Sequence, residues 1–238
     1  MKRFTLTFAF ILIIFHVYCQ QSNKILIFSE TKGYRHESIE SGREAITKLC
    51  LDNHISVDST EDPGKFNDAF LKNYDAIIFL NTTGDLFNEE QQNAFQNYIH
   101  LGGAWVGIHA ATDAEYNWPW YGKLAGAYFK SHPAQQEAKV KVTDRENPST
   151  KMLPAEWKRF DEWYNYKDVS KNIKVLAYLD ETSYKGGEMN GSHPIVWYQD
   201  FEGGKAFYTG FGHTKETFND PLFMNHLLGG IKLVMRKK

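Results

Sequence analysis

The chain has 238 residues, of which 42% are apolar and 15% aromatic, so it is long and apolar enough to bury at least one core. Its formal net charge is −2 and its pI is about 6.5. Proteins that bind nucleic acid usually carry a strongly basic surface, and this composition argues against that class of partner.

The first residues have the pattern of a secretory signal peptide. Lys2 and Arg3 precede an almost entirely apolar run that ends at Phe15, and polar residues follow Cys19. This run is shorter than the roughly 20 apolar residues of a transmembrane helix. We expect a signal peptide over residues 1–19, cleavage near Cys19-Gln20, and a secreted or periplasmic chain without a transmembrane segment. Acylation of Cys19 is less favoured, because a bulky tyrosine precedes it.

Strand and helix patterns then alternate as far as residue 109. Strands are expected at 24–29, 54–58, 75–80 and 104–109, and helices at 38–53, 66–74 and 88–101. The run DAIIFL is continuously apolar, which is typical of a strand buried on both faces. Asn88 and Gln91 have the spacing of a capping box, and Gly102 ends that helix. This alternation predicts a mostly parallel sheet with helices on both faces.

The C-terminal half changes in pattern. Strands are expected at 138–143, 173–179, 194–198 and 205–209, joined by long loops, and a last helix is expected at 221–235. Asp220 and Pro221 form a suitable start for that helix. We expect one domain over residues 20–238, with extra strands in this half. Cys50 adjoins the apolar stripe of a helix, so a buried and inert thiol is expected.

In an open parallel sheet, ligands bind at the carboxyl ends of the strands. Three loops that follow expected strands contain a histidine, and these are His36, His109 and His213. The third strand is followed by another polar loop, 81–85. We expect these loops to share one site. Structural roles are expected for the histidines at strand starts or within helices, namely His54, His100 and His226. For His132 and His193, each in a Ser-His-Pro triplet, a structural role and a site role remain open.

Two segments, 115–129 and 161–166, are dense in aromatic residues. The ordinary explanation is a small core beneath long loops. The alternative is a sugar platform, where a flat ring stacks on a sugar and nearby polar groups bind its hydroxyls. The candidates for such a platform are Trp118, Trp120, Tyr121, Trp163 and Tyr164, with Glu115 and His132 as polar partners.

A metal site has only weak support from the sequence. Zinc sites often show short motifs such as H-E-x-x-H or paired cysteines, and neither occurs here. No cofactor is required by any motif. A divalent metal such as zinc, if bound, would be held by dispersed histidines, namely His36, His109, His132 and His213.

Several segments resemble the ThuA-like (trehalose utilisation) family over residues 24–235. They include KILIFSETKGYRHESI, FLNTTGDLFNEEQ, GIHAATDAEYNWPWYGKLAGAYFKSHP and GGKAFYTGFGHT. The resemblance implies a flavodoxin-like, doubly wound α/β fold similar to that of the class I glutamine amidotransferases. His109 stands where those enzymes have their nucleophilic cysteine. An imidazole cannot form their thioester intermediate, so glutaminase activity is not expected.

The same resemblance implies carbohydrate metabolism, with trehalose or a related disaccharide as substrate class and a functional link to sugar 3-dehydrogenases. We therefore expect an enzyme that acts on a glycoside or its 3-keto derivative by acid–base chemistry. His109 is the expected base, Asp113 or Glu162 would orient it or act as the acid, and His36 or His213 would polarise the carbonyl.

Three alternatives remain open at this level. A direct glycoside hydrolase would need two carboxylates roughly 5 to 9.5 Å apart. The candidates for this pair are Asp113, Glu115, Asp161 and Glu162. A sugar-binding protein without catalysis would need the aromatic residues but not His109. A scaffold for protein association is the least favoured. Polar groups that converge on one point would favour chemistry over binding.

Overall fold

The computed structural model describes residues 23–236, so the expected signal peptide lies outside the described part of the chain. Its centre is a nine-stranded sheet in the order β2-β1-β3-β4-β11-β10-β9-β6-β7. The first five strands in this order are parallel to one another. They are β2 (Ser56–Thr60), β1 (Lys24–Phe28), β3 (Ala76–Leu80), β4 (Ala104–Ile108) and β11 (Gly204–Thr209).

The C-terminal half extends this sheet with antiparallel strands. They are β10 (His193–Phe201), β9 (Lys174–Leu179), β6 (Gln136–Val142) and β7 (Glu156–Asp161). A separate two-stranded sheet pairs β5 (Tyr128–Ser131) with β8 (Asn165–Lys167). The parallel part has the flavodoxin-like strand order, with β11 taking the place of the fifth strand. The fold is therefore α/β and mostly parallel at its centre, with extra strands in the C-terminal half.

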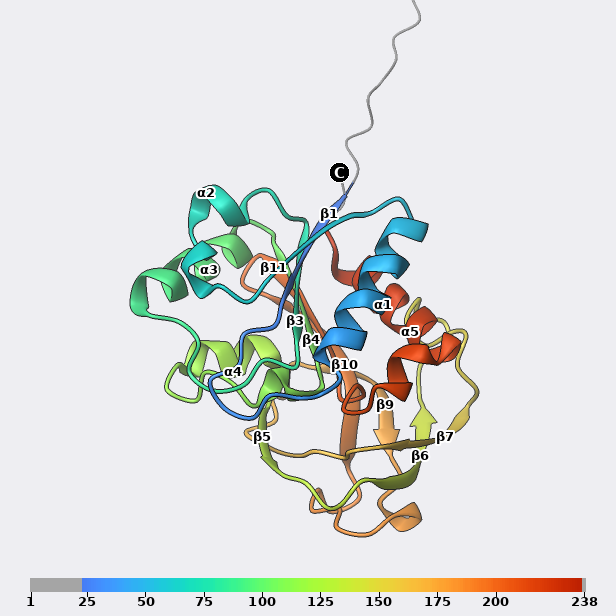
Figure 1. Cartoon of the computed structure of the whole chain (residues 1–238). Coiled ribbons are helices and arrows are strands. Elements are labelled where there is room, and N and C mark those ends of the chain that lie inside the picture. The colour runs from blue at the N-terminus through green and yellow to red at the C-terminus, as the bar shows by residue number, and fades with distance from the viewer. Residues whose placement is uncertain (1–22, 237–238) are drawn as a thin grey trace, which may run out of the picture.

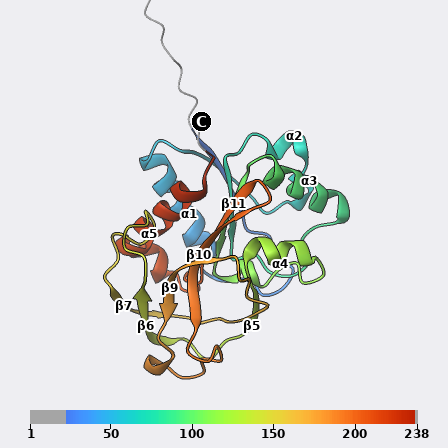
Figure 2. The ribbon, with the colours of Figure 1, turned by 180° about the vertical axis from the view of Figure 1, so that it is seen from behind.

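Helices cover both faces of the sheet (Figures 1 and 2). One face carries α1 (Ile39–Asp52) and α5 (Pro221–Val234). The other carries α2 (Asp68–Leu71), α3 (Glu89–His100) and α4 (Pro119–Ala125). Short 3₁₀ turns connect these elements, namely η1 (Pro63–Lys65), η2 (His109–Thr112), η3 (Glu181–Ser183) and η4 (Glu216–Asn219).

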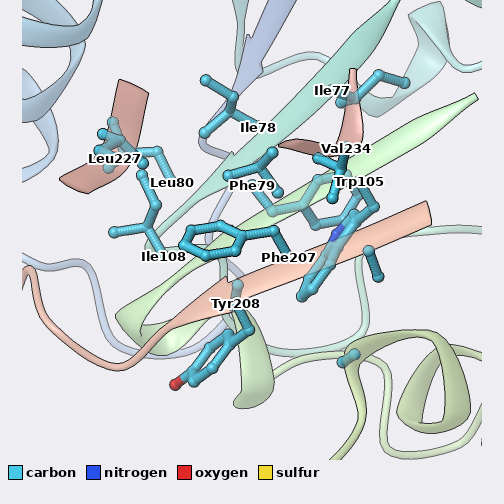
Figure 3. Packing of buried hydrophobic residues seen from close by; sticks show 14 of the residues in the cluster. Ile77, Ile78, Phe79, Leu80, Trp105, Ile108, Phe207, Tyr208, Leu227 and Val234 are labelled. Atoms are coloured by element: carbon cyan, nitrogen blue, oxygen red, sulfur yellow. The ribbon is translucent and has the colours of Figure 1, made fainter. Parts of the chain in front are cut away.

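The core lies on both sides of the parallel strands, where β3 and β4 are buried along their whole length. Figure 3 shows side chains of β3, β4 and β11 in this core. On the α3 side, Phe79 stacks against Phe95 with ring centroids 5.3 Å apart. On the α5 side, Phe207 lies 5.6 Å from the ring of His226. This dense packing fixes the strand ends from which the site is built.

Local capping chemistry agrees with the element boundaries. Asn88 and Gln91 form the expected capping box at the start of α3. The Asp220 carboxylate accepts a hydrogen bond from the backbone N–H of Leu222 at the start of α5. The helix expected over 66–74 is much shorter, a single turn capped by Asn67. A proline and glycine in η1, just before it, delay the helical backbone.

Cys50 is buried as expected, and burial raises the pKa of its thiol to about 11. The thiolate is therefore scarce at neutral pH, which agrees with an inert side chain. Among residues 23–236 there is no helix with the length and apolar character needed to cross a membrane.

Candidate active site and metal centre

Three of the expected loops meet at the carboxyl ends of the parallel strands. His36 follows β1, His109 follows β4 directly, and His213 follows β11. Glu162 joins them from the end of β7, a strand at the far edge of the sheet. One nitrogen or oxygen atom from each of these four side chains lies within 4.8 Å of each of the others. We call these four residues the His/Glu cluster.

The three imidazole rings of the cluster face one another with nearly equal spacing. The centroid of His36 lies 5.1 Å from those of both His109 and His213, and the latter two are 5.2 Å apart. Each pair of rings is close to perpendicular, with interplanar angles of 86°, 83° and 81°. Three rings arranged in this way can direct one nitrogen each toward a common point.

His109 has a backbone that few residues adopt. Its φ is +47°, in the left-handed region, directly after the last residue of β4. This sharp turn directs the imidazole out of the sheet. Its Nδ1 lies 3.1 Å from the carbonyl oxygen of Gly210. A carbonyl only accepts, so Nδ1 carries a hydrogen, which leaves Nε2 as the nitrogen that faces the cluster.

Glu162 occupies the remaining corner of the cluster. Its Oε2 lies 3.0 Å from His213 Nδ1 and 3.4 Å from His109 Nε2. Its other oxygen, Oε1, lies 3.2 Å from Nδ1 of His132 at the exposed rim. Burial alone would disfavour the charged carboxylate, but hydrogen bonds to His109 and His213 outweigh burial and hold its pKa below the ordinary value.

The spacing of these atoms fits a small metal ion. His213 Nδ1 and His109 Nε2 are 3.3 Å apart, which completes a triangle with sides of 3.0, 3.3 and 3.4 Å. Tetrahedral ligands about 2.0–2.1 Å from zinc are about 3.3–3.4 Å from one another. His109 also donates its second ring N–H to a backbone carbonyl, the arrangement that orients metal-bound histidines.

His36 completes the set of nitrogen donors. It is 3% exposed, and its Nδ1 is a buried nitrogen without a hydrogen-bond partner among the described residues. Burial, with the neighbouring His109 and His213, lowers its pKa to about 2. A neutral imidazole is the form that binds a metal, so this environment suits a ligand better than a charged group.

The side chain of Gln135 contacts the far nitrogen of His213. Its Nε2 lies 2.7 Å from His213 Nε2. With the amide in this orientation, Gln135 donates and His213 Nδ1 carries its hydrogen toward Glu162. Rotation of the amide would let Gln135 accept instead, leaving Nδ1 of His213 free to bind a metal.

A buried carboxylate, Asp161, holds the two loops that carry His213 and Glu162. Its oxygens accept hydrogen bonds from the backbone N–H groups of Glu162, Gly212 and His213 at 3.0–3.1 Å. The Thr217 hydroxyl donates to the same carboxylate at 3.0 Å. Asp161 is fully buried, so this clamp is shielded from water.

Asn81 joins the remaining loops. Its amide donates to Ser38 Oγ at 3.0 Å and to the Gly212 carbonyl at 3.1 Å, while its oxygen accepts from Ala110 N–H at 3.4 Å. Asn81 was expected in a rim loop without a role, Asp161 was expected only as a candidate hydrolase carboxylate, and Gln135 was not expected at the site. Their effect depends on chain segments far apart in sequence, which no local motif reveals.

Asp113 lies near the cluster but outside it. Burial raises the pKa of its carboxyl, while a hydrogen bond from Tyr116 and the charges of His109 and His132 act in the opposite direction. The Tyr116 hydroxyl donates to Asp113 Oδ1 at 2.6 Å. A carboxyl with a raised pKa next to the cluster is suited to proton transfer.

Most of the expected aromatic platform lies elsewhere. Tyr121 and Trp163 are fully buried, and Trp118 is 8% exposed, so their ring faces pack in the core. Trp120 is half-buried and donates to Glu202 in the β10–β11 turn, at the opposite end of the strands. Local composition predicted the aromatic density, whereas burial removes three of these residues from a sugar platform and position removes Trp120.

The other expected substrate-binding residues divide between the site and the scaffold. Tyr164 does reach the cluster, where its ring lies 4.2 Å from that of His109. His132 lies at the rim, where it contacts Glu162. It was expected among the metal ligands, but the fourth residue of the cluster is Glu162. The Glu115 carboxylate instead accepts from the backbone N–H groups of Leu86 and Phe87, which is a structural role.

The remaining histidines have structural contacts. His226 is fully buried and bonds to Ser149 and Thr209. His193 is buried, with Nε2 2.8 Å from the Tyr164 carbonyl oxygen. Its role is therefore to hold the segment that follows Glu162, which settles the open question for this Ser-His-Pro triplet in favour of structure.

Comparison with known proteins gives the same fold and adds the family. The sequence model described as "Trehalose utilisation" (ThuA) matches residues 24–234. The chain belongs to the ThuA family. A search of curated proteins finds no match.

Solved structures of ThuA-like proteins are similar to the chain along nearly its whole length. A ThuA-like protein from Bacteroides uniformis is 28% identical with a TM-score of 0.75, and the match covers 90% of this chain and 92% of that one. One from Parabacteroides merdae is 23% identical, with a TM-score of 0.71 and coverages of 92% and 93%. A β-galactosidase from Bacillus circulans, 12% identical with a TM-score of 0.59 over 88% of this chain and 30% of that chain, shares the fold alone.

Proposed function

We propose that this chain is an exported enzyme of carbohydrate metabolism, in which the His/Glu cluster binds a divalent metal such as zinc and the substrate is a glycoside carrying a ketone. The observation that carries the proposal is the convergence of three imidazoles and one carboxylate on a single buried point. A protein that only binds sugar would have no need of such a cluster. The family supports carbohydrate as the substrate class.

The cluster residues have distinct tasks in this proposal. His36, His109, His213 and Glu162 would hold the ion, and the ion would polarise the ketone oxygen of the substrate on accepting it as a further ligand. Imidazole nitrogens are suitable ligands for zinc and related transition metals. Tyr164, stacked beside His109, and the Asp161 clamp keep the donors in place.

The chemical step is removal of a proton from the carbon next to the ketone. Asp113 is the group suited to take this proton, because its carboxylate lies beside the cluster in a partly buried position. The C–H electron pair then forms an enolate. When the enolate reforms the ketone, the glycosidic C–O bond breaks and the leaving oxygen takes a proton, for which His132 at the rim is the candidate donor. The products are an unsaturated keto sugar and an alcohol.

This role for Asp113 differs from the expectation that His109 is the base. In the structure His109 directs Nε2 to the centre of the cluster, where it contacts His213 and Glu162. A nitrogen that binds a metal cannot also remove a proton. A 3-keto sugar as substrate would accord with the expected link to sugar 3-dehydrogenases, which would supply it.

The proposal is tested by metal analysis and turnover of the purified protein. We expect stoichiometric divalent metal, turnover of 3-keto-trehalose but not trehalose, and loss of activity with a chelator. His213→Gln should lower both metal content and turnover, the latter by at least about 10²-fold. His109→Asn is a second ligand variant, chosen because asparagine accepts the left-handed backbone.

The matched control is His100→Gln, at an exposed histidine bonded to Glu202. It should leave both metal content and turnover unchanged. Full turnover by metal-free protein would show that the reaction needs no metal, and His109 would again be the candidate base. Failure of the metal-loaded protein to convert either sugar would contradict the proposed enzymatic activity.

A further inference from the structure

A polar pocket of about 380 Å³ opens beside the His/Glu cluster and shares the wall formed by His213. Its volume is in the range of small-molecule sites. The residues that line it include Tyr34, Glu37, Gln135, His213, Lys215 and Glu216. The proposed reaction takes place at the cluster itself, so an occupant of this pocket would be a part of the substrate remote from the reacting carbon.

Tyr34 gives this pocket an exposed aromatic face. Its side chain is among the exposed large apolar groups, at 63% exposure, and its ring meets that of His36 edge-on at 4.9 Å. The rings proposed from sequence as a sugar platform are mostly buried, whereas Tyr34 is open to solvent next to the cluster. An exposed ring of this kind can stack on the apolar face of a sugar.

The backbone around Tyr34 is held firmly, so its exposure is not the result of a loose loop. The Thr83 hydroxyl donates to the Tyr34 carbonyl at 2.9 Å, and Lys32 N–H donates to the Thr83 carbonyl at 2.8 Å. Arg35, the next residue, pairs with both Glu40 and Glu61. A backbone that is already fixed loses little further entropy when the ring binds a ligand.

The charges of the pocket favour a neutral occupant. Lys215 is its one ammonium group among the lining residues, and Lys215 pairs with Glu37 at 3.0 Å. Glu216 adds a second carboxylate. A phosphate group would meet an excess of negative charge here, whereas hydroxyl groups could bond to the carboxylates and to the amide of Gln135.

We propose that this pocket is the subsite for a second, uncharged sugar ring, which stacks on Tyr34, and that it excludes phosphorylated sugars. This inference rests on the proposed function for the identity of the substrate class. It extends that function by naming the residues that select two linked rings.

The test measures binding separately from turnover, using the unreactive disaccharides trehalose and cellobiose as probes in calorimetric titrations. We expect Tyr34→Ala to weaken binding of the preferred disaccharide by about tenfold. Tyr34→Phe keeps the ring and should bind within about twofold of the original protein. Leu101→Ala is the control for loss of an exposed apolar side chain, because Leu101 is 76% exposed and lies at the opposite end of β4.

Further outcomes decide the proposal. Trehalose 6-phosphate should bind more weakly than trehalose, and removal of the metal should leave disaccharide binding largely intact. Equal affinities for the original protein and Tyr34→Ala, or no binding of either disaccharide, would overturn the subsite. Binding that depends on Tyr34 as expected, without turnover of keto sugars, would instead contradict the proposed enzymatic activity and support the subsite.

Discussion

Asp161 controls the site without belonging to the set of metal ligands. It accepts hydrogen bonds from the backbone N–H groups of Glu162, which follows the edge strand β7, and of His213, which follows the central strand β11. Arg159 approaches the same carboxylate at 4.0 Å and forms a closer ion pair with Asp220 at 2.6 Å. A network of this kind orients ligands before the metal arrives, and residues in such positions commonly tune affinity.

Asp161→Asn tests this positioning role. An amide keeps the size of the side chain but turns one acceptor into a donor that faces backbone N–H groups. We expect metal affinity to fall by roughly 10- to 100-fold, measured by competition with a chelating dye. Asp62→Asn is the control, at an exposed aspartate that caps η1. An unchanged metal affinity in Asp161→Asn, with lowered thermal stability alone, would make the clamp purely structural.

At the scale of elements, sharp backbone turns at the strand ends decide where the cluster side chains lie. β4 ends in His109 with a φ of +47°, and the loop after β11 passes through Gly212 with a φ of +123°. A Cβ atom at Gly212 would lie 2.8 Å from the Ile108 side chain. The loop that carries His213 therefore needs glycine both for its dihedral angle and for its close approach to β4.

Gly212→Ala should displace that loop and weaken the site. We expect a loss of more than about 1 kcal/mol in the free energy of unfolding, measured in urea, together with a lower metal affinity. Gly191→Ala is a control with a φ of +79° but no atom within 4 Å of the added carbon. It should lose stability through backbone strain alone and keep its metal affinity. Equal metal affinities in the two variants would contradict the loop argument.

At the scale of the molecule, the twisted sheet brings together loops that follow strands 1, 3, 4 and 11 of the chain. His36 and His213 are separated by most of the sequence, yet their ring centroids lie 5.1 Å apart. The strand order β1-β3-β4-β11 places the carboxyl ends side by side, and the antiparallel extension returns β7 so that Glu162 reaches the same point. The whole fold is thus required to assemble the cluster.

The pH dependence of unfolding is a property of the whole molecule. His226 is fully buried between α5 and β11, and burial lowers its pKa from 6.5 to about 4. Between these values the unfolded chain binds a proton that the folded chain does not, so stability falls as the pH drops from 6.5 toward 4. The contribution reaches about 3 kcal/mol at the acid end of this window.

Urea unfolding of the metal-free protein at several pH values measures this effect. His226→Gln should be less stable at pH 7 but lose less stability on acidification, because the titrating group is absent. His100→Gln, at an exposed position, should follow the original protein. Parallel pH profiles for the original protein and His226→Gln would show that His226 does not contribute. His36 remains in both proteins, so the difference between them isolates His226.

The sequence by itself determined the class of fold, the strands of its parallel part and the loops that carry the histidines. These follow from local chemistry, since apolar runs such as DAIIFL form buried strands, and capping residues such as Asn88 and Asp220 set helix starts. The family resemblance, now confirmed by the match over residues 24–234, extended this to a flavodoxin-like topology.

Only the tertiary structure decided which polar and aromatic side chains meet. Trp118, Tyr121 and Trp163 resemble binding residues in sequence, but packing buries them, while Tyr34 remains exposed beside the cluster. Glu162 joins three histidines because β7 returns to the site, a pairing that depends on contacts distant in sequence. Local patterns record how a segment folds, whereas convergence on one point is set by the way strands are ordered in the sheet.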